Sequence, residues 1–284
     1  MTSTLFDLSG KLPPDAEAAL QQVAGILAQQ RIPFFVVGAL ARDLLLEHAW
    51  HLPPQRATRD IDFGVRVADW LQFERLKNAL RATGEFTPHP HQQQRLLHRN
   101  GVIIDVVPFG EIESPPGSIA WPDAEGVIMT TLGFAEAYAH AVKVLIGGNT
   151  AIAVCSPCGL ALLKLITWDE RRERKDASDL GTLLYYYLAV GNEARLFDEH
   201  IDLLDLPDHK LAGARMLGRD LNLLLTAQSR PLVEAILMRE TTPGSRYQLA
   251  ATMLAGCHFL DNDFERTLTL LEMLWQGISE ARNP

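Results

Sequence analysis

Two aspartates, Asp60 and Asp62, are separated by a single residue in the run Asp60-Ile61-Asp62-Phe63. The alternation of acidic and apolar residues predicts a β-strand, so both carboxylates leave one face while Ile61 and Phe63 point into the other. Carboxylates this close repel each other. Taken alone, a pair of this kind is more often a solvated strand edge or an ion pair with a neighbour such as Arg59 than a cation site.

Asp105 adds a third carboxylate. It interrupts the apolar run 102–107, which predicts a buried strand. A buried carboxylate is costly unless it meets an arginine, several backbone donors or a cation. If this strand neighbours the Asp60 strand, three carboxylates converge, and one or two divalent cations, Mg²⁺ or Mn²⁺, relieve their repulsion. Asp60, Asp62 and Asp105 are therefore the predicted metal ligands and catalytic residues.

A glycine turn precedes these strands. The apolar run 34–37 predicts a buried strand that ends at Gly38, and helical periodicity begins at Ala39. A strand that passes directly into a helix can turn backbone N–H groups and the positive end of the helix toward an anion. The alternative is a plain tight turn. Its place one helix and one loop before the Asp60 strand favours a phosphate contact.

Lys164 lies inside the otherwise apolar helical run 160–166, so it must either extend to solvent or meet an anion. The segment 168–179, WDERRERKDASD, follows and contains four basic and five acidic residues. We interpret this segment as a helix. Its charges indicate either a ligand-binding wall or a solvated face with i,i+4 pairs such as Glu170 with Arg174 and Arg172 with Asp176.

Hydrophobic periodicity predicts the elements that position these residues. Helices are expected over 15–30, 39–50 and 69–83, strands over 34–37, 60–67 and 101–109, and a long loop over 111–125. The runs 141–146 and 151–155 flank Gly-Gly-Asn-Thr, which indicates a hairpin. From Ser156 onward only helical periodicity is found. The predicted fold class is α/β (α+β): a mixed sheet with flanking helices in residues 1–156, then an all-helical lobe in 157–284 that completes the cleft.

Composition limits the class of protein. With 284 residues, 47% hydrophobic and 21% charged, the chain is neither collagen-like nor disordered. It shows neither a membrane-length apolar run nor a secretory leader, and three cysteines are too few for a disulfide framework, so a cytoplasmic location is expected. The net charge of −9 repels polyanions, so a nucleotide or nucleic acid needs a local basic site or metal ions.

The ordered set of motifs resembles the polymerase-β-like nucleotidyltransferase superfamily. It consists of Gly38-Ala39-x-Ala41-Arg42-Asp43, then Arg56-Ala57-Thr58-Arg59-Asp60-Ile61-Asp62-Phe63, then Asp105. A later segment looks like that of the AbiEii/AbiGii-type toxin-like nucleotidyltransferases, and comprises Leu163-Lys164-Leu165, Trp168, Arg171, Arg172, Lys175-Asp176 and Asp179-Leu180. Ala39 departs from the Ser or Gly usual in the superfamily and lacks a hydroxyl for phosphate.

The resemblance implies an enzyme that transfers NMP from an NTP to a hydroxyl and releases pyrophosphate, with two Mg²⁺ ions on the three aspartates. It also implies that Lys164 contacts a phosphate and that Asp176 or Asp179 completes the cleft. The nucleotide-binding residues are then Gly38, Ala39, Arg42, Arg59, Lys164, Asp176 and Asp179.

The nature of the acceptor stays open at this point. RNA, protein and small molecules are candidates, the last as in an aminoglycoside-type adenylyltransferase. The toxin-like resemblance implies a toxin with an antitoxin partner, whereas an inactive nucleotide-binding scaffold is the non-enzymatic alternative. The presence of all three aspartates favours the enzyme.

Overall fold

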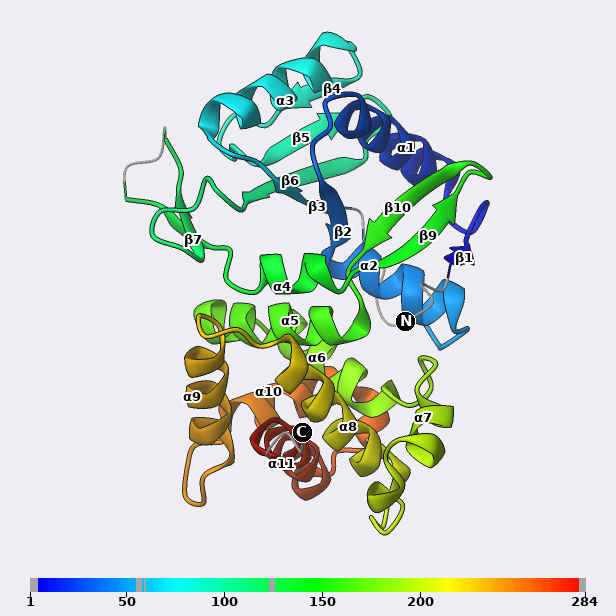
Figure 1. Cartoon of the computed structure of the whole chain (residues 1–284), viewed down its shortest axis with the longest axis vertical. Helices are drawn as coiled ribbons and strands as arrows, with labels where there is room; N and C mark the ends of the chain where they lie inside the picture. Colours follow the sequence, from blue (N-terminus) through cyan, green and yellow to red (C-terminus); the bar gives the residue numbers. More distant parts are fainter. Residues whose placement is uncertain (1–4, 55–57, 59, 123–125, 281–284) are drawn as a thin grey trace. The chain divides into compact units, whose positions relative to one another are not determined.

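The structure is a computed structural model that describes residues 5–54, 58, 60–122 and 126–280 (Figure 1). The chain divides into two compact units, Met1–Ser156 and Pro157–Pro284. The first combines strands and helices, and the described residues of the second form helices joined by turns and loops, with no strand.

The first unit is built on an eight-stranded mixed sheet with the order β1-β9-β10-β2-β3-β6-β5-β4. The pairs β1–β9, β10–β2 and β3–β6 are parallel, and the remaining neighbours are antiparallel. A separate two-stranded sheet pairs β7 with β8. The strands are β1 (Leu5–Asp7), β2 (Phe34–Val37), β3 (Asp60–Arg66), β4 (Phe86–Pro88), β5 (Arg95–His98), β6 (Ile103–Phe109), β7 (Ser118–Ala120), β8 (Ile128–Thr130), β9 (Val142–Ile146) and β10 (Thr150–Val154).

Helices α1 (Pro14–Gln29) and α3 (Trp70–Ala82) lie side by side in Figure 1. Apolar residues of α1 recur at helical spacing and are buried, which gives the helix one packing face. Asp69 caps α3 by accepting a hydrogen bond from the Gln72 amide at 2.7 Å. The short helices α2 (Gly38–Asp43) and α4 (Phe134–Ala139) complete the unit, and a π-helical segment, Leu44–Ala49, follows α2 directly.

The second unit contains α5 (Pro157–Arg171), α6 (Arg174–Tyr186), α7 (Glu193–Asp198), α8 (His209–Leu224), α9 (Arg230–Thr241), α10 (Gln248–Gly256) and α11 (Phe264–Ser279), with 3-10 turns at Ile201–Leu203 and His258–Leu260. Helices α8 and α11 cross at very close range. A Cβ atom on Gly218 would lie 2.3 Å from the Leu274 carbonyl oxygen, and one on Gly277 would lie 2.1 Å from that of Arg215. This crossing therefore requires glycine on both helices.

The predicted fold class, a mixed α/β sheet followed by a helical region, is confirmed by this topology. Several local predictions were wrong. The helix expected over 39–50 changes to π-helix at Leu44, the loop expected over 111–125 contains β7, and β1, β4, β5 and β8 were not predicted. These four strands are three or four residues long, too short for a period of two to stand out.

Two further expectations can be compared with the structure. Cys155, Cys158 and Cys257 are buried, and none of the three forms a disulfide. Within the described part of the chain, every helix is too short or too polar to span a lipid bilayer.

Candidate active site

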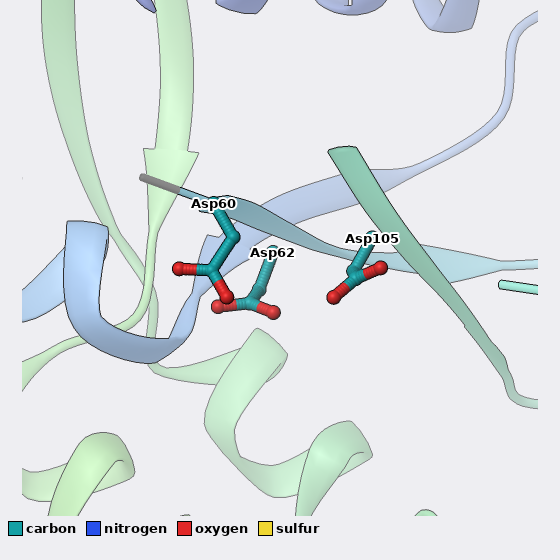
Figure 2. Close-up of side chains that lie close together, drawn as sticks. All are labelled: Asp60, Asp62 and Asp105. Carbon is teal, nitrogen blue, oxygen red and sulfur yellow. The ribbon is translucent and has the colours of Figure 1, made fainter. Parts of the chain in front are cut away.

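Asp60, Asp62 and Asp105 converge on one face of the sheet. Strands β3 and β6 are parallel neighbours, and their register places Asp62 directly opposite Asp105. One carboxylate oxygen from each aspartate lies within 4.8 Å of those of the other two. Figure 2 shows the three side chains extending from the two strands toward the same space. Ile61 and Phe63 are buried on the opposite face, as the alternation in the sequence predicts.

The glycine turn lies against this cluster. Gly38 follows β2, which pairs antiparallel with β3 so that Val37 is opposite Asp62. Gly38 has φ +69°, and a Cβ atom there would lie 2.1 Å from the Asp62 Oδ2 atom. A larger residue here would have to adopt a left-handed conformation and would also displace the Asp62 carboxylate. The turn and the aspartates form one structural unit.

Substituting Gly38 should therefore cost more than its backbone conformation explains. We expect Gly38→Ala to lower the free energy of unfolding by about 1–3 kcal/mol more than Gly84→Ala, because only the former pushes a methyl group into a carboxylate. Gly84 is the matched control: its φ is +74°, and a Cβ atom added there would have nothing within 4 Å. Urea denaturation measures both. Equal losses in the two variants would contradict the contact with Asp62.

Thr58 lies in the connection between the π-helical segment and β3. Its hydroxyl donates a hydrogen bond to the Asp60 Oδ1 atom at 2.7 Å and so orients that carboxylate. Arg59, a predicted nucleotide-binding residue, lies outside the described residues, as do Arg56 and Ala57 of the same motif.

Arg95 is the main feature of this site that the sequence analysis missed. It lies on β5 directly opposite Asp105. Its Nε atom donates to Asp105 Oδ1 at 2.8 Å, and a terminal nitrogen donates to Oδ2 at 2.6 Å. Hydrogen bonding to Asp105 is the largest cause of a raised Arg95 pKa, and the charges of Asp60 and Asp62 raise it further. The buried carboxylate thus has the arginine partner that its burial calls for.

Ala39 and Arg42 are both buried in α2. The Arg42 Nε atom donates a hydrogen bond to Asp43 Oδ1 at 2.9 Å. The nucleotide contacts predicted for these two residues, and for Gly38, stay predictions.

Lys164, Asp176 and Asp179 form a buried ionic cluster in the second unit. Lys164 on α5 places its Nζ atom 3.1 Å from Asp176 Oδ1 and 2.7 Å from Asp179 Oδ2, both on α6. Burial lowers the pKa of Lys164, but the two carboxylates together outweigh it and leave that pKa raised. Lys164 therefore meets anions of its own chain, and its predicted phosphate contact is untested.

The charged segment 168–179 is not the single helix that we predicted. Helix α5 ends at Arg171 and α6 begins at Arg174. Arg172 adopts φ +57°, and its guanidinium lies 4.3 Å from the centre of the Trp168 ring. The observed ion pairs also differ from those expected, and include Arg172 with Asp169, Lys175 with Glu173 and Arg171 with Asp176. Arg171, Arg172 and Lys175 are thus paired with carboxylates of the same segment.

A mixed sheet with three clustered aspartates on adjacent strands beside a glycine turn is the arrangement that the sequence resemblance led us to expect of a nucleotidyltransferase. The family described as nucleotidyl transferase AbiEii toxin, of the type IV toxin–antitoxin system, matches residues 25–236. Because this match covers well over half of the chain, the protein belongs to that family. The predicted family resemblance and enzyme class are confirmed.

Three similar solved structures illustrate the range of neighbours. The antibiotic-resistance factor ANT(2'')-Ia is 14% identical, with 68% of this chain and 97% of that chain covered and a TM-score of 0.38. A CCA-adding enzyme in complex with ATP is 16% identical, with coverages of 97% and 69% and a TM-score of 0.27. A tRNA nucleotidyltransferase with a primer tRNA and an ATP analogue is 15% identical, with coverages of 89% and 80% and a TM-score of 0.24. No curated protein matches this chain.

Proposed function

We propose that this nucleotidyltransferase transfers NMP from an NTP to an acceptor hydroxyl and that Asp60, Asp62 and Asp105 hold the divalent cations required. The observation that carries the proposal is the convergence of three carboxylate oxygens within 4.8 Å on adjacent strands. Carboxylate oxygens are hard ligands, and their number and spacing fit Mg²⁺ or Mn²⁺. When bound, these cations neutralise charge on the phosphates and lower the barrier to displacement at phosphorus.

The residues of the chain then have distinct roles. Asp60 and Asp62 leave the same face of β3, so together they would hold a cation, and the Thr58 hydroxyl fixes the orientation of Asp60. Asp105 accepts the proton of the acceptor hydroxyl while the oxygen of that hydroxyl attacks the α-phosphorus. The bond from the α-phosphorus to the bridging oxygen breaks, and pyrophosphate leaves.

The backbone N–H groups at Gly38 and Ala39 begin a helix and therefore have no partner within its first turn. We place the NTP phosphates near this turn because Gly38 lies against Asp62. Contacts from Arg42, Arg59, Lys164, Asp176 and Asp179 are part of the same proposal and rest on the family resemblance. The type IV toxin family also supports a cytoplasmic toxin with an antitoxin partner.

The acceptor can be assigned by following the label. Incubation with each NTP labelled at the α-phosphate, a cell lysate and Mg²⁺ should label one of three fractions: RNA, protein or small molecules. We favour RNA or protein because the chain belongs to a toxin family. Label found only in small molecules would shift the assignment to an aminoglycoside-type activity, and no label in any fraction would contradict the proposed transfer.

A further inference from the structure

The arrangement of charges around Asp105 includes a fixed cation. Asp62, Asp105 and Arg95 occupy directly paired positions on three adjacent strands, β3, β6 and β5. Directly paired residues of neighbouring strands project from the same face of a sheet. Asp62, Asp105 and Arg95 therefore form a row of charged side chains across the sheet, with Asp105 in the middle.

The contact between Arg95 and Asp105 is two-pronged. Two nitrogens of the guanidinium donate to the two oxygens of the carboxylate, at 2.8 Å and 2.6 Å. Paired N–H···O⁻ bonds of this kind fix the plane of the carboxylate as well as its charge. The Asp105 side chain is 10% exposed and that of Arg95 25%, so solvent screens the pair only in part.

This pairing has a consequence for cations. Each Asp105 oxygen already accepts one N–H, and the guanidinium keeps its positive charge at every physiological pH. A divalent cation that bridges Asp105 to Asp62 must share an oxygen with Arg95 and overcome its charge. The energetic cost of a cation that bridges Asp62 and Asp105 therefore arises at Asp105, because the guanidinium of Arg95 is hydrogen-bonded to that carboxylate.

The geometry points to Arg95 as a positioning residue that holds Asp105 ready for the acceptor and keeps a divalent cation from bridging Asp105 to Asp60 and Asp62 until the nucleotide is bound. The negative phosphates of an NTP supply the charge that offsets the guanidinium. Asp60 and Asp62 would therefore hold a cation before the nucleotide arrives, and Asp105 would become a ligand only in the nucleotide complex. This inference rests on the proposed function.

The probe is Mn²⁺ alone, and titration calorimetry measures its affinity for the full chain in the absence of nucleotide. We expect Arg95→Gln to raise Mn²⁺ affinity by at least roughly tenfold, because a positive charge close to the ion is removed. The same variant should transfer NMP more slowly, because Asp105 is no longer held. Tighter Mn²⁺ binding together with slower transfer is not the result of a merely structural residue. Unchanged or weaker Mn²⁺ binding by Arg95→Gln would overturn the inference.

Arg95→Lys separates charge from geometry. Lysine keeps the positive charge but cannot form the two-pronged contact, so Mn²⁺ affinity should stay within about threefold of the parent while transfer falls. Arg99→Gln is the matched control, because Arg99 follows β5 directly, is 76% exposed and pairs with Glu85. It should change neither quantity. An Arg95→Lys variant that binds Mn²⁺ as tightly as Arg95→Gln would overturn the role of the charge.

A double variant tests the inference even if Arg95→Gln fails to fold. Arg95→Gln with Asp105→Asn removes the ion pair without changing the net charge of the cluster. If Asp105 takes no part in cation binding before the nucleotide arrives, Mn²⁺ affinity should match that of the parent. Loss of Mn²⁺ binding in this variant would overturn the inference while leaving the proposed function intact. The proposed function itself fails if the single variant Asp62→Asn binds Mn²⁺ as tightly as the parent protein does.

Discussion

In thermal unfolding with Mg²⁺ and a non-hydrolysable NTP, the Asp60→Asn/Asp62→Asn variant should show none of the stabilisation that the parent gains. A ligand at one hundred times its Kd stabilises the folded state by about 2.7 kcal/mol, so the difference is large. Without ligand, the variant should be as stable as the parent or slightly more stable, because two repelling carboxylates become neutral. Loss of binding without loss of stability identifies a functional cluster.

The control for this result removes two carboxylates elsewhere. Asp205 and Asp261 are exposed residues of the second unit. The Asp205→Asn/Asp261→Asn variant has the same net charge as the site variant and should keep the full stabilisation by Mg²⁺ and NTP. If the site variant is still stabilised as the parent is, the cation and nucleotide bind somewhere other than these aspartates.

A comparably large effect is expected at Lys164. Lys164→Met should lower the free energy of unfolding by about 3–5 kcal/mol, because it leaves two buried carboxylates without their lysine. Asp176 and Asp179 are 0% and 2% exposed. Lys175→Met is the matched control, since Lys175 is half exposed and pairs with the equally exposed Glu173, a pair worth about 0–1 kcal/mol. Urea denaturation compares the two variants.

Two further measurements sharpen this prediction. Adding Asp176→Asn and Asp179→Asn to Lys164→Met should restore much of the lost stability, because the two carboxylates that Lys164 neutralised are then uncharged. The pKa of Lys164 is raised in the folded state. Its contribution should therefore be complete below the pKa of an unfolded lysine, about 10.4, and disappear as the pH rises through the folded value. A Lys164→Met loss as small as that of Lys175→Met would contradict the buried cluster.

The convergence of the aspartates could be predicted from sequence because it depends on strong local patterns. The alternation in 60–63 places two carboxylates on one face, and the apolar run around Asp105 indicates a buried strand. The glycine turn was also predictable, whereas its contact with Asp62 was not. That contact depends on the antiparallel pairing of β2 with β3, which no local pattern specifies.

Arg95 could not be assigned for a related reason. Its strand, β5, has only four residues, follows a polar stretch rich in His and Gln, and owes its place to pairing with β6. The sequence left an arginine, backbone donors or a cation as alternative partners for Asp105, and the tertiary structure determines that Arg95 is one. The break at Arg172 is similar, since the segment contains neither Gly nor Pro to signal it. There the tertiary packing of α5 and α6 overrides local helix propensity.

Transfer of label from an NTP labelled at the α-phosphate, compared with the same NTP labelled at the γ-phosphate, tests the assigned reaction and its site together. The parent protein is predicted to transfer the α-label to an acceptor and to release the γ-label as pyrophosphate, only with Mg²⁺ or Mn²⁺ present. Asp62→Asn should reduce this transfer to background. Transfer of the γ-label to the acceptor, or undiminished α-label transfer by Asp62→Asn, would contradict a nucleotidyltransferase centre at Asp60, Asp62 and Asp105.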